Sequence, residues 1–172
     1  RLARAKLEVV AVRRFGKILR TGKLNKQLNW AEREAMKVKD EVLRVAERHG
    51  INVFLVTNGG IRPPANPLAR LIIVPPDEDA ADNWIADHIT AGDITVTNDI
   101  PLAARCIEKS AKAIRPNGEP FTEAAIGMNL ANRELMVGLR ETGTITGGPL
   151  PFSKRDRSRF LSAFETMVQA SK

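Results

Sequence analysis

Cysteine and histidine are both scarce in this sequence. Cys106 is the single cysteine, which excludes an internal disulfide, and two histidines supply few ligands for a zinc site. We therefore expect a reducing, cytoplasmic setting. Because Cys106 lies in the apolar run 102–107, we expect a small buried side chain there rather than a reactive thiol.

Long apolar runs and nucleotide-binding fingerprints are also missing. No run approaches the roughly 20 residues of a membrane span, and the short run 7–12 is interrupted by Glu8. We expect neither a membrane partner nor a secretory signal. The glycine patterns of dinucleotide-binding and P-loop proteins do not occur either, so we expect no dinucleotide cofactor.

Positive charge is distributed unevenly along the 172 residues. Residues 1–28 contain nine Lys or Arg and one acid, a net charge of +8, whereas the whole chain carries +7 and the remainder therefore −1. Such a segment suits a poorly ordered arm, a phosphate-contacting arm or part of a targeting sequence, and we favour the first. We divide the chain into this basic segment, 1–28, and one α/β domain, 29–172, because a hydrophobic content of 43% suits a single core.

Helical and extended patterns alternate through the second segment. Apolar residues recur at helical spacing over 31–49 and stop at Gly50, with Glu41 on the opposite, solvent side. Further helices are expected over 81–89, from 102, over 122–140 and after a capping pair, Ser153 and Asp156. The helix over 122–140 is apolar on more than one side, so we expect it to be buried. Strands are expected at 51–56, 71–74, 94–96 and from 113, which predicts a parallel sheet flanked by helices.

Asp99 follows the strand 94–96 at the start of a helix, and two roles fit it. Asp is a preferred N-cap, and on this segment alone capping is the commoner role. An Asp at the carboxyl end of a parallel strand also lies where α/β enzymes bind ligands. Asp79 and Asp82 follow the strand 71–74 by one short loop and are neighbours on a helix surface. Converging carboxylates would suit Mg²⁺ or Mn²⁺, although helix caps and solvated acids account for the same residues.

Four cations share the first turns of the last helix: Lys154, Arg155, Arg157 and Arg159. Next to a glycine-rich connection, such a run can bind phosphate through backbone amides and bidentate arginines. The solvated face of an amphipathic helix gives the same pattern and is commoner for a lone run. Aromatic residues do not interleave with these cations, so a stacking platform for single strands is not indicated. Asn58, at the end of the strand 51–56, is a further candidate for phosphate contact.

Several ordered motifs make the sequence recognisable: DAADNWIA (79–86), TNDIPLA (97–103), PNGEPFT (116–122) and GGPLPFSKRDRSRF (147–160). From residue 38 to the end the chain resembles the YaiI/YqxD family of uncharacterised bacterial proteins, whose fold is similar to the PIN nuclease domain. The resemblance implies a PIN-like three-layer sandwich with a central, mostly parallel sheet. PIN-like relatives are metal-dependent ribonucleases. The resemblance therefore implies RNA as a partner and Mg²⁺ or Mn²⁺ bound by the catalytic acids Asp79, Asp82 and Asp99.

The start of the chain departs from the family pattern. Family members open with a strand that runs into Asp-Ala-Asp-Ala-Cys-Pro-Val-Lys, which gives the strand an acid at its carboxyl end. Counted without a gap, the equivalent positions hold Glu32 and Glu34, which we take as metal ligands although each is one methylene longer. Metal-site geometry tolerates displacements of only about half an ångström. The run 7–12 could replace the missing strand, but it leads into Arg13 and Arg14.

Two functional interpretations follow. The first is a PIN-like, metal-dependent ribonuclease that is impaired by the altered first-strand motif, with the basic run 154–159 as a surface for the phosphate backbone. The second is a non-catalytic module that binds RNA or protein. The sequence leaves the substrate and the oligomeric state open.

Overall fold

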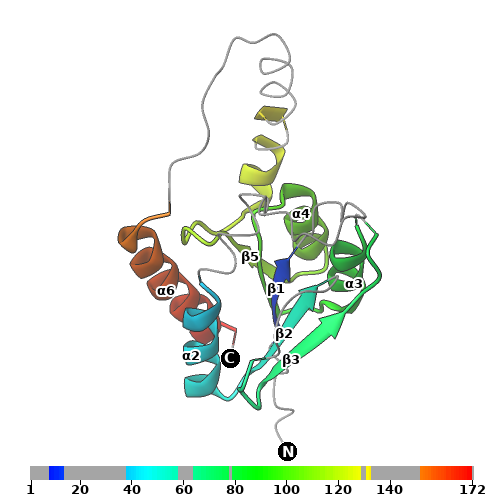
Figure 1. Ribbon diagram of the computed structural model, residues 1–172. Coiled ribbons are helices and arrows are strands. Elements are labelled where there is room, and N and C mark those ends of the chain that lie inside the picture. The colour runs from blue at the N-terminus through cyan, green and yellow to red at the C-terminus, as the bar shows by residue number, and fades with distance from the viewer. Residues whose placement is uncertain are drawn as a thin grey trace, which may run out of the picture.

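Parallel strands and helices alternate in the computed structural model, which describes residues 8–13, 38–57, 64–77, 79–128, 131–132 and 152–171 (Figure 1). In chain order the elements are β1 (Glu8–Arg13), α2 (Lys39–His49), β2 (Asn52–Thr57), β3 (Ala69–Ile73), α3 (Ala80–His88), β4 (Ile94–Val96), α4 (Ile100–Glu108), β5 (Lys112–Ile114) and α6 (Lys154–Gln169). None of the helices in these ranges is long and apolar enough to span a membrane.

The five strands form one parallel sheet in the order β3-β2-β1-β4-β5. β1 is the central strand. It pairs over its full length with β2, from Glu8 opposite Asn52 to Arg13 opposite Thr57, and its middle residues pair with β4. The predicted α/β class, a parallel sheet flanked by helices, is confirmed.

The strand that the run 7–12 suggested is present as β1, shifted by one residue. It lies within the basic segment 1–28, so residues 8–13 of that segment belong to the sheet. The boundary between segments at residue 28 stays a prediction. Glu32 and Glu34 lie outside the described residues.

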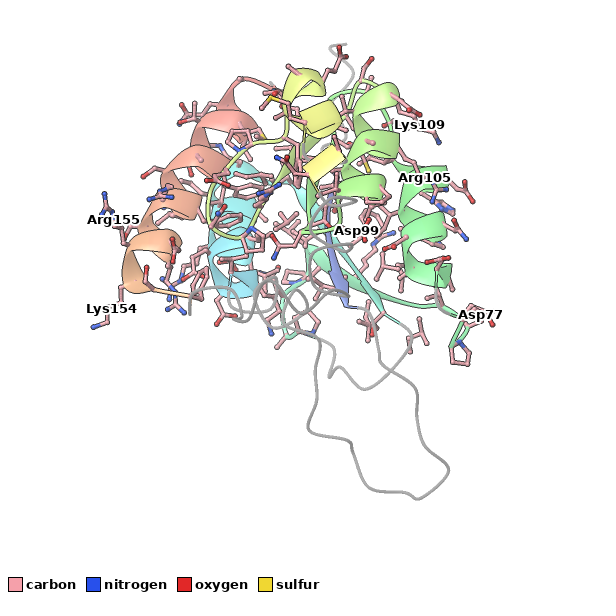
Figure 2. All side chains as sticks on the ribbon, turned by 90° about the horizontal axis from the view of Figure 1, so that it is seen from above. Asp77, Asp99, Arg105, Lys109, Lys154 and Arg155 are labelled. Carbon is pink, nitrogen blue, oxygen red and sulfur yellow. The ribbon has the colours of Figure 1, made fainter. Side chains whose placement is uncertain are left out.

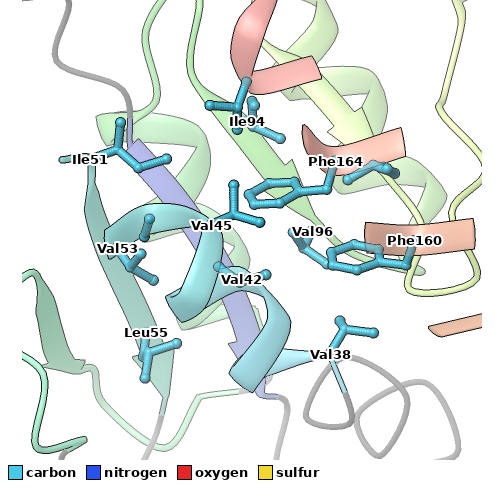
Figure 3. Packing of buried hydrophobic residues seen from close by; sticks show 13 residues of the cluster. Val38, Val42, Val45, Ile51, Val53, Leu55, Ile94, Val96, Phe160 and Phe164 are labelled. Atoms are coloured by element: carbon cyan, nitrogen blue, oxygen red, sulfur yellow. The ribbon is translucent and has the colours of Figure 1, made fainter. Parts of the chain in front are cut away.

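The first face of the sheet is covered by α2 and α6, which lie side by side (Figures 1 and 3). Apolar residues recur every three or four positions along both helices, so each buries one stripe. Phe160 and Phe164 are fully buried on α6, and their rings stack with centroids 5.4 Å apart. Their rings lie beside Val45 of α2 and Val96 of β4 (Figure 3), and Val53 and Leu55 of β2 belong to the same buried cluster. Burial of each phenylalanine contributes about 1.5–3 kcal/mol.

The second face is covered by α3 and α4. Successive side chains of a strand point to opposite faces of the sheet. Phe54 and Val56 of β2 therefore point to this second face, opposite to Val53 and Leu55. Small residues are frequent in the cluster, and Cys106 is fully buried within it. Thr95 Oγ1 donates a hydrogen bond to Cys106 Sγ at 3.4 Å, and burial raises the pKa of the thiol. The expectation of a small buried cysteine is therefore confirmed, and its low reactivity stays a prediction.

The long helix expected over 122–140 is seen only in part, because residues 129–130 and 133–150 are not among those described. It begins after Thr122, whose hydroxyl accepts a hydrogen bond from the N–H of Ala125 at 3.1 Å. Most side chains over 123–128 are exposed, and Met128 is 69% exposed. Only Ile126 of this stretch is buried. The expectation of a helix buried on several sides is wrong for the part described.

Candidate functional site

The carboxyl edge of the sheet contains a point where the strand order reverses. β2 and β3 extend from β1 on one side, and β4 and β5 extend on the other. Parallel α/β sheets bind ligands outside the strand ends at such a switch point. Arg13 ends β1 there and is paired in register with Thr57, while Asp99 follows β4. The candidate site therefore lies between the ends of β1 and β4.

Asp99 caps α4, as the sequence predicts. Its Oδ1 accepts a hydrogen bond from the N–H of Leu102 at 2.8 Å, and its own N–H donates to Thr97 Oγ1 at 2.9 Å. Within the described part of the chain, Oδ2 takes part in no hydrogen bond. Figure 2 shows Asp99 near the middle of the edge, between α6 and α3. One carboxylate oxygen thus fixes the helix start while the other is available to a ligand.

Asp79 and Asp82 belong to the start of α3. Asp79 occupies the N-cap position, but its side chain makes no capping hydrogen bond and is exposed. Asp82 is half-buried in the first turn. Its negative charge adds slightly to the effect of burial on the pKa of Cys106, so it lies close to α4. Asp79 is therefore open to solvent, whereas Asp82 is partly covered by its neighbours.

The acids to which the resemblance assigns a metal do not form a cluster of metal ligands among the described residues. No group of three or more His, Cys, Asp or Glu in the described ranges could hold a metal ion, and Asp79, Asp82 and Asp99 all lie within those ranges. Glu32 and Glu34 lie outside them, so their role as ligands stays a prediction.

The basic run is at the start of α6, as expected. Ser153 and Asp156 form the predicted capping box: Ser153 Oγ accepts from the N–H of Asp156, and Asp156 Oδ2 accepts from the N–H of Ser153. The Ser153 hydroxyl and N–H both donate to Asp156 Oδ2, and these two hydrogen bonds lower the pKa of Asp156. The helix N-terminus therefore already has an anion of its own. Lys154 and Arg155 extend outward from α6, away from Asp99 (Figure 2). The cationic side chains, rather than the helix end, are what this surface offers to a phosphate.

Arg157 has a partner that sequence reasoning missed. Its Nε lies 3.3 Å from Oε1 of Glu41 on α2. Glu41 was expected on the solvent side of its helix, yet its side chain is only 6% exposed. The expectation failed because Glu41 stands three positions after Val38 and four before Val45, which puts it at the border of the apolar stripe. The helical spacing of Glu41 from Val38 and Val45 was the sequence signal that could have revealed its burial.

A second arginine, Arg115, also stands at this edge and was not predicted. It follows β5, the strand next to β4, and its guanidinium carbon lies 4.7 Å from the centre of the Phe121 ring. The turn that follows reaches α6. A Cβ at Gly118 would lie 2.7 Å from backbone atoms of Arg159 and Phe160. The Asn-Gly pair indicated the turn but not its contact with the last helix. Arg115 thus lies between the switch point and the basic run, whereas Asn58 falls outside the described residues.

Comparison with known proteins gives matches over most of the chain. A family model described as the uncharacterised YaiI/YqxD family matches residues 30–170. A UPF0178 protein of Paramagnetospirillum magneticum is 55% identical over 139 residues, which cover 81% of this chain and 92% of the relative. A UPF0178 protein of Rhodopseudomonas palustris is 55% identical over 140 residues, 81% of this chain and 89% of the relative. No solved structure matches. β1 precedes the range that the family model matches.

Proposed function

The chain belongs to the YaiI/YqxD family, and we propose that it is a PIN-like RNA-binding protein whose metal-dependent ribonuclease activity is weak or absent. The observation that carries this proposal is the end of the central strand. β1 ends in Arg13, opposite Thr57, whereas the family pattern implies an acid where the first strand ends. A positive residue type at this point disfavours a divalent cation and favours a phosphate.

The rest of the edge supports the binding of an anion. Arg115 and the basic run over 154–159 add full charges along one side. A nucleic-acid backbone is a chain of phosphates and binds mainly through such contacts. Asp99 is the acid that keeps an available oxygen, so residual hydrolysis would depend on it.

The experiment measures binding and cleavage separately on one labelled single-stranded RNA. We expect binding that weakens steeply with salt and is unaffected by EDTA, together with little cleavage in Mn²⁺. A version whose segment 25–37 is rebuilt to the family pattern serves as the positive control for cleavage. Asp99→Asn keeps the cap, because Asn is as good an N-cap as Asp, and removes only the charge.

Two outcomes would contradict the proposal in different ways. Robust, EDTA-sensitive cleavage by the unaltered chain, lost in Asp99→Asn, would refute the impairment. Absence of salt-dependent RNA binding would refute the RNA partner and favour the second interpretation, a protein-interaction module.

A further inference from the structure

α2 and α6 run in the same direction along their shared face. Glu41 in the first turn of α2 meets Arg157 in the first turn of α6, and Arg48 near the end of α2 meets Glu165 further along α6. α2 ends just before β2 begins, so its first turn lies at the carboxyl edge of the sheet. The pair of Glu41 and Arg157 is therefore at the same edge as Asp99.

The two members of this pair are buried to very different extents. The side chain of Glu41 is 6% exposed, whereas that of Arg157 is 54% exposed. Glu41 Oε2 is buried and has no hydrogen-bond partner among the residues that the structure describes. A buried carboxylate is expensive unless it is paired and fully hydrogen-bonded, so this acid is poorly explained by stability alone.

The geometry of Arg157 suggests what the acid does. The ion pair uses Nε, and neither Nη nitrogen forms an ion pair with any residue that the structure describes. The two Nη nitrogens make the fork that binds a phosphate in a bidentate manner. An arginine held at Nε keeps this fork available and has already lost much of its rotamer freedom.

We propose that Glu41 is a positioning residue that holds Arg157 for contact with a phosphate of the RNA backbone. This inference rests on the proposed function and adds to it the residue that prepares the contact. It assigns different roles within the basic run, because Arg157 is ion-paired with a buried acid whereas Lys154 and Arg155 extend into solvent. Preorganisation of this kind improves affinity by reducing the entropy lost on binding.

The test uses Glu41→Gln in the full chain and a labelled single-stranded RNA. Removing an acid from an RNA-binding surface should tighten binding by simple electrostatics. Positioning predicts the opposite sign: Glu41→Gln should weaken binding about three- to tenfold, the effect of releasing one long side chain. Glu47→Gln is the matched control, since it neutralises an exposed acid of the same helix and should leave affinity unchanged or slightly improved.

Two variants of Arg157 complete the test. Arg157→Lys keeps the charge but not the fork, and should weaken binding as much as Glu41→Gln does. Arg157→Gln should reduce the slope of log affinity against log salt by about 0.7, which corresponds to one phosphate of a single strand. Glu41→Gln added to Arg157→Gln should have no further effect on affinity, because the two residues act as one unit.

The outcomes separate this inference from the function on which it rests. If the unaltered chain shows no salt-dependent RNA binding, the proposed function fails. If the unaltered chain binds but Glu41→Gln binds equally or more tightly, the positioning role is overturned and RNA binding stands. A lower melting temperature in Glu41→Gln with unchanged affinity also overturns it, since the pair would then serve only to hold α2 against α6.

Discussion

The two helical faces of the sheet are held together by different kinds of contact. Between α2 and α6, stacked phenylalanines fill the centre, and charged side chains tie the helices, with His49 and Arg48 on Glu165 in addition to the pair at Glu41. Between α3 and α4, the residues are smaller, and the polar contacts join a cation to a neutral acceptor: Arg105 donates to the Asn83 side chain and Lys109 to the Ala86 carbonyl. The first face should therefore respond to loss of volume and to acid, and the second to alkali.

The same contrast extends to the carboxyl edge. On the α4 side the edge has Asp99, whose carboxylate caps a helix. On the α6 side it has a run of cations, and the capping acid there, Asp156, is bound to Ser153. A phosphate would therefore meet attraction on one side and repulsion on the other, so we expect the proposed RNA strand to follow α6.

The largest effect is expected from Phe164→Ala on the α2/α6 face. The side chain is fully buried and stacks on Phe160, so its removal leaves a cavity as well as lost contacts. We expect the free energy of unfolding to fall by about 3–5 kcal/mol in urea denaturation. Leu161→Ala on the same helix is the control, because Leu161 is 37% exposed and should lose far less. A loss below about 1 kcal/mol for Phe164→Ala would show that the stability of this face does not depend strongly on buried side-chain volume.

The next effect concerns Gly118, whose turn packs on α6. Gly118 and Gly92 have nearly the same backbone conformation, with φ of 89° and 88°, so alanine should be strained similarly at both, by about 1–2 kcal/mol. Only at Gly118 would the added Cβ meet backbone atoms, at 2.7 Å, whereas nothing lies within 4 Å at Gly92. We expect Gly118→Ala to be about 1–3 kcal/mol more destabilising than Gly92→Ala in urea denaturation. Equal losses would show that the turn moves away from α6 easily.

The sequence predicted local features better than contacts between distant segments. The strand at 94–96, the stop at Gly50 and the capping box at Ser153 each depend on residues within one turn of one another, and each is confirmed. The run 7–12 was also identified as a possible strand, since alternation and β-branched residues are visible in any short segment.

Contacts between distant segments were harder to predict for a physical reason. The burial of Glu41 depends on α6, which lies more than 100 residues later, and hydrophobic periodicity assigns a border position to either side. The contact of Gly118 with Arg159 likewise depends on where the last helix packs. For the candidate site, the position of Asp99 could be predicted because it follows a strand, but the grouping of acids around it depends on how the helices pack.

An alkaline effect is expected on the α3/α4 face. Burial raises the pKa of the Cys106 thiol, and the hydrogen bond from Thr95 opposes this only partly. Above the ordinary cysteine pKa of about 8.5, the unfolded chain loses this proton while the folded chain keeps it, so stability falls as pH rises. The slope approaches about 1.4 kcal/mol per pH unit. Cys106→Ala should flatten the fall in the free energy of unfolding between about pH 8.5 and 10, and an unchanged slope would contradict the assignment.

The smallest effect is expected in acid, on the α2/α6 face. The hydrogen bond with His49 lowers the pKa of Glu165, with smaller contributions from Gln169 and Arg48. A carboxyl whose pKa is lower in the folded chain stabilises the fold above the unfolded pKa, about 4.3 for glutamate, and this contribution is lost as pH falls through the folded pKa. Because the pair is partly exposed, the change should stay under about 1 kcal/mol.

Glu165→Gln tests the acid response directly. The variant should lose part of the decline in the free energy of unfolding below about pH 5, and its stability should approach that of the unaltered chain as the pH falls. Asp156→Asn is the matched variant, because the pKa of Asp156 is lowered by Ser153 at the start of the same helix. The two effects should add, since the residues lie more than two turns apart on α6 and share no partner. If neither variant changes the acid slope while Cys106→Ala changes the alkaline one, Glu165 and Asp156 contribute nothing measurable to stability, and apolar packing accounts for the response of that face.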